Sequence, residues 1–252
     1  MRFDVITLFP ELFSAPLALG VTRRAFEDGK VDVKLWPLRD FGDSPHGRVD
    51  DRPYGGGPGM VMLVEPLERA LAAIREARAE REPEPAPLIH FTPTGRRIDQ
   101  AMVEGFAAGP GAVLLCGRYE GIDQRFLERH VDVELSLGDF ILSGGELPAL
   151  ALLDAVARLQ EGVLGDPESH RQDSFSEGLL DCPHYSRPDV LPGEHGVVPE
   201  VLLSGNHAAI ARWRRERALE ATARRRPDLI ASARAARRLG PADERFLQSL
   251  LL

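Results

Sequence analysis

Cysteine and long hydrophobic runs are both scarce in this chain of 252 residues. The two cysteines, Cys116 and Cys182, lie far apart and outside any Cys-x-x-Cys pattern, which argues against a disulfide framework and a zinc site. No window reaches the roughly 18 uncharged apolar residues of a membrane-spanning helix. Arg2 and Asp4 interrupt the first apolar stretch, where a signal peptide would need continuous hydrophobicity. These absences predict a soluble cytoplasmic protein with no membrane partner.

Lysine is almost missing, whereas arginine is abundant. Lys30 and Lys34 are the only lysines, so the Gly-rich segment 55–59 lacks the Gly-Lys-Ser/Thr ending of a Walker phosphate loop. The formal net charge of −8 argues against a generally basic surface that coats nucleic acid. Residues 201–252 nevertheless hold eleven arginines against five acidic residues. This asymmetry suggests a basic appendage for a polyanion, although a solvated, arginine-rich helical face would have the same composition.

Hydrophobic periodicity predicts an α/β architecture for roughly the first 160 residues. Alternation predicts strands at 2–8 and 31–36, with a helix between them that follows Pro10 and runs to about Phe26. A further helix is predicted over 66–81. The next segments predict strand, helix, strand, helix and strand in turn, at 88–92, 98–108, 112–116, 123–130 and 131–135. This rhythm predicts a parallel sheet with helices on its faces.

The last hundred residues have a different pattern. An apolar helix over 147–160 is expected to pack on the sheet or on a partner subunit. Residues 162–200 then lack any period, and so long a segment is usually functional or a linker. From His207 onward the chain is predicted helical, with breaks at Pro227 and at Gly240-Pro241 that give three helices.

Residues 50–60 combine acids, arginine and glycines in the order Asp-Asp-Arg-Pro-Tyr-Gly-Gly-Gly-Pro-Gly-Met. One interpretation is a tight turn whose glycines supply positive φ. Another is a ligand site, because a backbone without side chains lets an RNA base approach closely. Carboxylates at Asp50 and Asp51 could then accept hydrogen bonds from the Watson–Crick edge of guanine.

Two segments follow predicted strands and are rich in glycine. Residues 116–123 (Cys-Gly-Arg-Tyr-Glu-Gly-Ile-Asp) stand at the carboxyl end of a strand, where ligands of open parallel sheets bind. The alternative is a simple strand-to-helix turn with Asp123 as N-cap. Residues 137–148 place glycines on both sides of a short apolar strand, which suits an adenine cradle. Here the alternative is a bulged edge strand with Ser143 capping the next helix.

Residues 172–188 hold candidate general bases in the aperiodic connector. These are Asp173, Asp181, His170 and His184. Taken alone, either aspartate is more often part of a local turn or a cap, and His184 is more often structural. No Ser/His/Asp order or fixed pair of carboxylates stands out, so these residues by themselves do not specify a reaction.

Taken together and in order, these four segments resemble the bacterial tRNA (guanine-N1-)-methyltransferases of the SPOUT class, which methylate guanosine 37 beside the anticodon. The resemblance runs from Phe9-Pro10 to the Leu-Ser-Gly-Asn-His run at 203–207. It implies an α/β domain whose parallel sheet has helices on both faces and a deep trefoil knot, a rare exception to unthreaded folds. A small all-α domain follows. The implied domains are 1–161 for S-adenosylmethionine, a flexible linker at 162–177 that carries the base, and 178–252 for tRNA.

The resemblance also implies a homodimer with active sites at the subunit interface, S-adenosylmethionine as cofactor, and a weakly held Mg²⁺ without a dedicated protein site. The matching cofactor-binding residues are Phe91, Thr92, Pro93, Gly117, Tyr119, Glu120, Leu137, Gly138, Asp139, Phe140, Ile141, Leu142, Gly144, Gly145 and Pro148. The matching substrate-binding residues are Asp50, Arg52, Pro58, Gly59 and Ser174.

The catalytic residues implied by the resemblance are Asp173 and Arg158. Guanine N1 carries a proton, so Asp173 is expected to act as the general base that removes it. An aspartate with an ordinary pKa near 3.9 is a weak base at neutral pH. Arg158 is expected to help, because its permanent charge can stabilise the negative charge that develops on O6.

The chain departs from the family pattern at three places. Thr92-Pro93-Thr94-Gly95 stands for Ser-Pro-Gln-Gly, Phe140 stands for Tyr, and Gln172 stands for the frequent Glu before the base. Thr and Phe keep the hydroxyl and the ring, so cofactor binding should survive, while Gln172 could change the pH profile. The alternative function is a non-catalytic RNA-binding protein of the same fold, which would predict loss of Asp173, Arg158 or the glycines. A nucleotide-dependent enzyme is disfavoured by the missing lysine.

Overall fold

The computed structural model describes residues 1–43, 45–79, 86–165, 172–193 and 196–250. The chain divides into two compact units, Met1–Gly165 and Asp166–Leu252. Each is described by itself. Residues 166–171 of the predicted linker, with the candidate base His170, lie outside the described residues.

The first unit is built on a five-stranded sheet. Its strands are β1 (Arg2–Thr7), β2 (Asp32–Pro37), β5 (Leu88–Arg97), β6 (Gly111–Leu115) and β7 (Val133–Ser136). The spatial order is β2-β1-β6-β5-β7, and all neighbouring pairs run parallel. The predicted α/β fold with a parallel sheet is therefore confirmed, and all five carboxyl ends meet at one edge.

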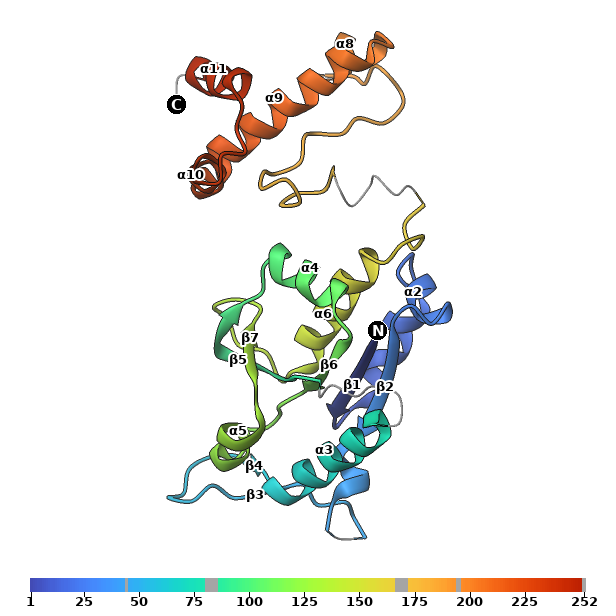
Figure 1. The fold of residues 1–252 in the computed structure, drawn as a ribbon, viewed down its shortest axis with the longest axis vertical. Coiled ribbons are helices and arrows are strands. Elements are labelled where there is room, and N and C mark those ends of the chain that lie inside the picture. Colours follow the sequence, from blue (N-terminus) through green and yellow to red (C-terminus); the bar gives the residue numbers. More distant parts are fainter. Residues whose placement is uncertain (44, 80–85, 166–171, 194–195, 251–252) are drawn as a thin grey trace. The chain divides into compact units, whose positions relative to one another are not determined.

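Helices cover both faces of this sheet (Figure 1). On one face, α2 (Arg23–Glu27), α4 (Gln100–Ala108) and α6 (Glu146–Arg158) share a hydrophobic cluster with Ala112 and Leu114 of β6. On the other face, α3 (Val64–Ala79) and α5 (Gln124–His130) pack with Val113 and Leu115. The two sets alternate along β6 because successive strand residues point to opposite faces.

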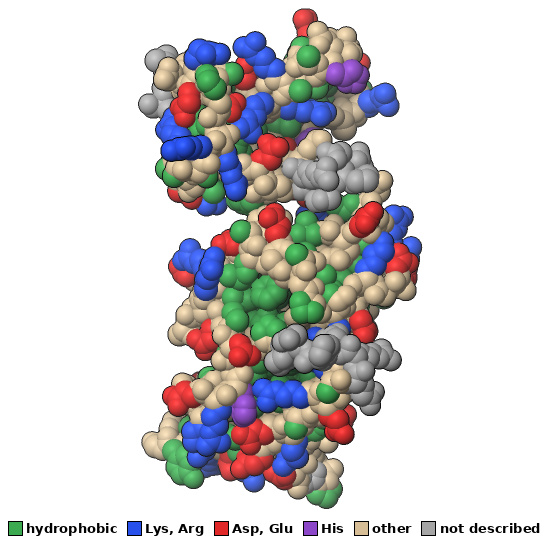
Figure 2. Space-filling view, viewed as in Figure 1, with side chains coloured by type: hydrophobic (Ala, Val, Ile, Leu, Met, Phe, Trp, Pro, Cys, Tyr) green, Lys and Arg blue, Asp and Glu red, His purple; other side chains and the backbone are tan. Residues whose placement is uncertain are grey.

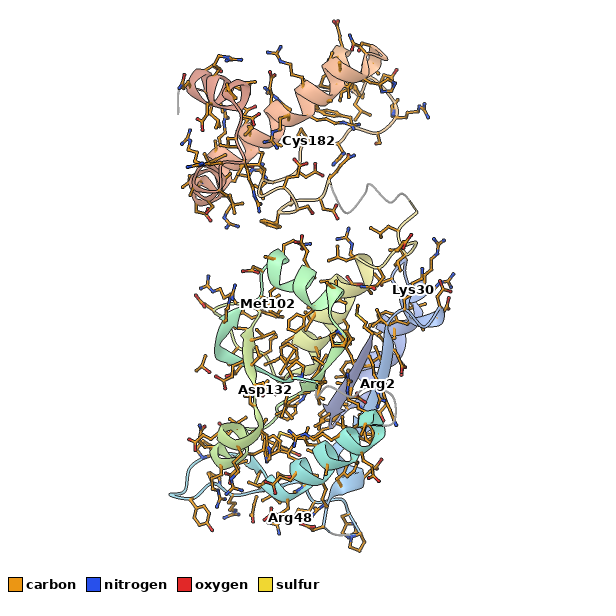
Figure 3. All side chains as sticks on the ribbon, in the orientation of Figure 1. Arg2, Lys30, Arg48, Met102, Asp132 and Cys182 are labelled. Carbon is orange, nitrogen blue, oxygen red and sulfur yellow. The ribbon has the colours of Figure 1, made fainter. Side chains whose placement is uncertain are left out.

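A buried charge cluster ties β1 to its neighbours. The Asp4 carboxylate is fully buried and accepts hydrogen bonds from Arg2 at 2.8 Å, Arg78 of α3 at 2.7 Å and Trp36 of β2 at 2.8 Å. Arg2 lies at the start of β1 beside α3 and also donates to the Ala77 carbonyl (Figure 3). Several donors around one acid satisfy a buried carboxylate that would otherwise be costly.

The structure differs from the predicted elements near the N-terminus and near the Gly-rich segment. The predicted helix from Pro10 to Phe26 is wrong. Its residues form a 3-10 helix η1 (Pro10–Phe13), a short α1 (Ser14–Ala18) and α2, because Gly20 adopts a left-handed φ of 77° that interrupts the helix. The region 38–60 contains η2 (Leu38–Phe41) and β3 (Asp50–Asp51), neither of which periodicity predicted. β3 pairs antiparallel with β4 (Val61–Met62), so the Gly-rich segment connects two strands.

Two local predictions for 116–148 can be compared with the structure. Asp123 caps α5 by accepting a hydrogen bond from the Arg125 N–H, as the simple-turn interpretation expected. The expected short strand within 137–148 is wrong, since residues 137–145 form a loop, and the N-cap of α6 is Gly145 instead of Ser143. β5 is longer than predicted and reaches Arg97, with a register irregularity between Phe91 and Arg96.

The second unit contains α8 (Glu200–Leu203), α9 (His207–Arg225), α10 (Pro227–Ala235) and α11 (Pro241–Ser249). The helices that begin at His207, Pro227 and Pro241 match the predicted breaks, because proline suits the first turn of a helix but not its interior. The short α8 was not predicted. A small core holds the unit together and consists of Leu179, Leu219, Ile230, Ala233 and Leu247.

Candidate functional site

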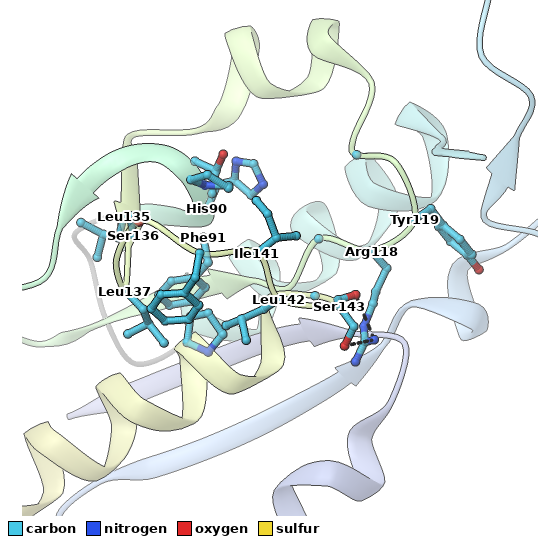
Figure 4. A pocket seen from close by; sticks show the side chains of 18 of the residues that line it. His90, Phe91, Arg118, Tyr119, Leu135, Ser136, Leu137, Ile141, Leu142 and Ser143 are labelled. Carbon is cyan, nitrogen blue, oxygen red and sulfur yellow. Dashed lines mark hydrogen bonds between the residues drawn. The ribbon is translucent and has the colours of Figure 1, made fainter. Parts of the chain in front are cut away.

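A cavity of about 350 Å³ lies at the carboxyl ends of β5, β6 and β7 in the first unit (Figure 4). We call it the loop pocket. Residues 90–93 of β5, the end of β7, the loops at 117–121 and 137–145 and the first turn of α6 form its wall, at the edge of a parallel sheet where ligands usually bind. Its lining residues are His90, Phe91, Thr92, Pro93, Gly117, Arg118, Tyr119, Glu120, Gly121, Leu135, Ser136, Leu137, Gly138, Phe140, Ile141, Leu142, Ser143, Gly144, Gly145 and Pro148.

The structure brings the predicted cofactor-binding residues to this one cavity, with a single exception. Asp139 is exposed, does not line the loop pocket and forms an ion pair with Arg97. Other lining residues, notably His90, Arg118 and Ser143, were not among the individually predicted cofactor-binding residues, although the resemblance places the cofactor in the segments 90–94, 116–120 and 137–148 that contain them. Each is adjacent in the chain to a predicted residue, so its neighbourhood was visible in the sequence but the direction of its side chain was not.

Glycines allow the loops of the pocket to touch through their backbones. The Gly145 N–H donates to the Gly117 carbonyl at 3.0 Å, and a β-carbon added at Gly145 would lie 2.7 Å from Cα of Cys116. A β-carbon at Gly117 would lie 3.3 Å from Nε2 of His90. Side chains at these positions would push the loops apart, so the glycines set the shape of the pocket.

A buried ion pair fixes the loop pocket to the sheet. Glu146 at the start of α6 is fully buried; one carboxylate oxygen accepts from Arg118 Nε at 2.9 Å and the other from the Thr7 hydroxyl at 2.9 Å. Arg118 also donates to the Ser143 carbonyl at 3.1 Å, as Figure 4 shows, and stacks over Phe9 at 4.5 Å from the ring centroid. Residues from β1 and two pocket loops are therefore held by one carboxylate.

His90 presents an unsatisfied polar atom beside the loop pocket. The residue is buried, and its Nδ1 has no good hydrogen-bond partner among the described residues, with Glu134 Oε1 at 3.5 Å. Burial lowers the pKa of the imidazole, although the neighbouring Glu134 carboxylate opposes this shift. His90 is therefore a buried imidazole in the pocket wall with one ring nitrogen left unsatisfied among the described residues.

The Gly-rich segment lies directly against the loop pocket. The Glu120 N–H donates to the Met60 carbonyl at 3.0 Å, and the Met62 N–H donates to the Gly121 carbonyl at 2.9 Å. Gly59, with φ of 73°, packs against the Glu120 side chain. These contacts join the predicted substrate segment to the predicted cofactor segment.

Tyr119 reaches from the loop pocket to Asp50, which stands in β3. Burial raises the pKa of the phenol, the Asp50 carboxylate raises it further, and Arg39 opposes this shift. Tyr119 adopts a left-handed φ of 62°, an uncommon conformation for a residue with a side chain. Of the other predicted substrate residues in this segment, Arg52 and Pro58 are exposed.

Asp173 and Ser174 belong to the second unit, whereas the half-buried Arg158 ends α6 in the first. Asp173 lines a cavity of about 420 Å³ with Asp181 and His184. The Ser174 hydroxyl accepts a hydrogen bond from the Asp181 N–H at 2.9 Å. Burial tends to raise the pKa of Asp181, but hydrogen bonds from His184 at 2.8 Å and from the Cys182 N–H lower it overall.

The described residues offer one cluster with metal-ligand types, namely Asp181, Cys182 and His184, whose ligand atoms lie within 4.8 Å of one another. Its carboxylate is already engaged with His184 and with the backbone of Cys182. Sequence spacing had not suggested this grouping. None of the helices in the described part of the chain combines the length and apolar character that crossing a membrane requires.

Comparison with known proteins finds close relatives along the whole chain. The family model described as tRNA (Guanine-1)-methyltransferase TrmD matches residues 1–232. A tRNA (guanine-N(1)-)-methyltransferase of Leptothrix cholodnii is 70% identical, with 100% of each chain covered. Proteins of the same name from Methylibium petroleiphilum and Bordetella pertussis are 69% and 58% identical, and in both cases 99% of this chain and 98% of the relative are covered.

Proposed function

The chain belongs to the tRNA (guanine-1)-methyltransferase family, and we propose that it transfers a methyl group from S-adenosylmethionine to N1 of guanosine 37 in tRNA. It is an enzyme that methylates N1 of a guanine in tRNA and uses S-adenosylmethionine. The observation that carries the proposal is the loop pocket, where residues matched to the cofactor and the Gly-rich segment matched to the substrate meet at one edge of the sheet.

The loop pocket fits the chemistry of S-adenosylmethionine. Phe140, Ile141 and Leu142 give apolar surface for the adenine, and the glycine-bounded loops leave space that a β-carbon would fill. His90 also lines this space, while its unsatisfied Nδ1 is buried on the side of Glu134. Ligand positioning by fixed loops keeps the reacting atoms in line, and this contributes much of the rate. When bound, S-adenosylmethionine supplies an electrophilic methyl group on its sulfonium.

In this proposal Asp173 accepts the N1 proton of guanine while the methyl group is transferred. Arg158 stabilises the negative charge that develops on O6, because arginine carries a permanent positive charge. Asp50 holds the target guanosine from the Gly-rich side, together with Arg52, Pro58 and Gly59, and Ser174 acts from the connector. Its hydroxyl already orders the connector by accepting from Asp181. Mg²⁺ is proposed as a largely hydrated, weakly held ion.

We further propose that the first unit is knotted and acts as a homodimer. The knot is proposed from the resemblance, and the loops at 116–121 and 137–145 that would take part in it contact each other through Gly117 and Gly145. Phe140, Ile141 and Leu147 are apolar and are 55%, 80% and 52% exposed. Figure 2 shows hydrophobic side chains gathered on the visible face of this unit. Exposed apolar surface beside a ligand pocket is typical of a protein interface, so the active sites are proposed to lie between subunits.

The functions that we propose for the segments of the chain follow the resemblance. Residues 1–161 bind S-adenosylmethionine, the connector 162–177 carries Asp173 and Ser174, and the helical residues 178–252 bind tRNA. The eleven arginines of 201–252 support the last assignment, since arginine neutralises phosphate. We propose that the enzyme works in the cytoplasm, where its tRNA substrate is found.

The decisive experiment measures methyl transfer from labelled S-adenosylmethionine to unmodified tRNA transcripts with G or A at position 37 after G36. We expect transfer to the G37 transcript alone. Asp173→Ala should lose transfer while it keeps cofactor affinity, measured by calorimetry. Asp228→Asn, an exposed carboxylate at the start of α10, is the matched control and should stay active.

Two results would contradict the proposal. If the Asp173→Ala variant still transferred the methyl group, Asp173 could not be the general base. Tight tRNA binding by the wild-type protein without any methyl transfer would favour the non-catalytic RNA-binding alternative.

A further inference from the structure

A second cavity of the second unit, of about 460 Å³, adjoins the Asp173 cavity and shares His184 and Arg214 with it, but its other walls are different. We call it the Tyr185 cavity. The loop at 183–189 forms one side, and α8 with the first half of α9 forms the other. Its lining residues are Pro183, His184, Tyr185, Ser186, Arg187, Asp189, Val198, Leu202, Leu203, Ile210, Trp213 and Arg214.

Two aromatic rings meet in the wall of this cavity. The ring centroids of Tyr185 and Trp213 are 6.1 Å apart, and the ring planes are tilted by 57°. Tyr185 is 47% exposed and Trp213 is half-buried. Leu203 extends the apolar wall and is 55% exposed. Exposed aromatic faces are costly in water but are good surfaces for a planar heterocycle.

The two arginines that line the Tyr185 cavity differ from several other arginines of this unit in their ion pairing. Arg212, Arg215 and Arg234 are held in ion pairs with Glu216, Asp243 and Glu244. Arg187 and Arg214 are exposed and have no hydrogen bond or ion pair within the part of the chain that the structure describes. The cavity therefore combines aromatic walls with two cationic groups that can bind an anion, and Asp189 is the acidic residue among its lining residues.

We propose that the Tyr185 cavity binds one unstacked nucleotide of tRNA, distinct from the target guanosine, with its base against Tyr185 and Trp213 and its phosphate at Arg187 and Arg214. The inference rests on the proposed function in taking tRNA as the ligand. Aromatic surface and guanidinium groups are the two components with which proteins recognise single-stranded RNA. A nucleotide matches both, whereas a purely apolar partner would leave the arginines without a counterion.

The first test compares tRNA affinity among variants of the full-length protein. Tyr185→Leu keeps apolar volume but removes the ring, so we expect tRNA binding to weaken roughly 5- to 100-fold. Tyr185→Phe keeps the ring and should bind within about twofold of wild type. Phe246→Leu is the matched control, because Phe246 lines another cavity of this unit, of about 450 Å³. Affinity for S-adenosylmethionine and kcat at saturating tRNA should not change in Tyr185→Leu, so the effect should fall on KM for tRNA.

The second test locates the nucleotide. Transcripts with a single abasic position, placed in turn along the unpaired loops, are bound to wild type and to Tyr185→Leu. One transcript lacks the base that would enter the Tyr185 cavity. Its affinity for the wild-type protein should be low, and Tyr185→Leu should not lower that affinity further. Trp213 fluorescence, read in a Trp36→Phe background, should change on binding of intact tRNA and not of that abasic transcript.

The third test concerns the phosphate. Arg187→Gln with Arg214→Gln should reduce the slope of log affinity against log salt by about 1 to 2. Arg212→Gln, which loses a guanidinium already paired with Glu216, should leave the slope nearly unchanged. Wild-type tRNA affinity in Tyr185→Leu, or an equal Tyr185→Leu effect on every abasic transcript, would overturn the inference. These readouts measure binding, so they remain valid if methyl transfer itself fails.

Discussion

Gly145 and Cys116 lie so close that a β-carbon on Gly145 would stand 2.7 Å from Cα of Cys116. The contact joins the first turn of α6 to the end of β6, two segments that both border the loop pocket. Gly145 has a φ of −79°, which any residue can adopt. Its requirement for glycine therefore comes from the neighbouring backbone and not from its own conformation.

Gly145→Ala should weaken S-adenosylmethionine binding by roughly tenfold or more, because the loops must separate and a misplacement near 1 Å can cost up to about 100-fold in activity. Isothermal calorimetry measures the affinity directly. Gly105→Ala is the matched control, since Gly105 lies in α4 with nothing within 4 Å of an added β-carbon. This control should keep its affinity and gain up to about 1 kcal/mol of stability from helix propensity. Equal cofactor affinity in both variants would contradict the packing argument.

Glu146→Ala should lower the free energy of unfolding by about 3–5 kcal/mol, because it leaves the guanidinium of Arg118 buried without its carboxylate and removes the acceptor of Thr7. Urea unfolding measures this change. The control is Glu76→Ala on the exposed side of α3, which should stay within about 0.5 kcal/mol of wild type. A loss as small as that of the control would show that the buried pair contributes little.

His90 should make stability depend on pH below neutrality. Burial lowers its pKa in the folded state below the unfolded value of about 6.5. Between the two values the unfolded chain binds more protons, so the free energy of unfolding rises with pH through this window and is level above it. Urea unfolding at several pH values should show a shallower slope in His90→Gln than in wild type. Identical slopes would mean that His90 is equally basic in both states.

Tyr119→Phe should affect tRNA more than the cofactor. The ring remains in the loop pocket, but the polar interaction of the phenol with the Asp50 side chain is lost. A net loss of about 1 kcal/mol corresponds to a KM for tRNA roughly fivefold higher. Steady-state kinetics with varied tRNA, and calorimetry with S-adenosylmethionine, separate the two effects. A change confined to cofactor affinity would contradict a link between Tyr119 and the substrate side.

Much of the secondary structure could be predicted from local pattern. The alternation in β1, the apolar run of β6 and the 3.6-residue period of α3 can each be read from neighbouring residues. Pro227 and Pro241 mark helix starts because proline lacks an N–H. The helix expected from Pro10 to Phe26 failed because Gly20 turns the chain, a choice that local periodicity does not reveal. The strands β3 and β4 were not predicted because each has only two residues, which is too short for a periodic pattern.

The sequence by itself determined the kinds of element, their order and the identity of the segments that resemble a cofactor and substrate site. Only the tertiary structure decided which atoms meet. Thr7 and Glu146 are separated by 139 positions yet share a hydrogen bond of 2.9 Å, and His90 faces Gly117 across two neighbouring strands. Such contacts depend on strand order and on how the helices close over the sheet. Periodicity and propensity act over a few residues, whereas the close packing of the interior sets these distances across the whole chain.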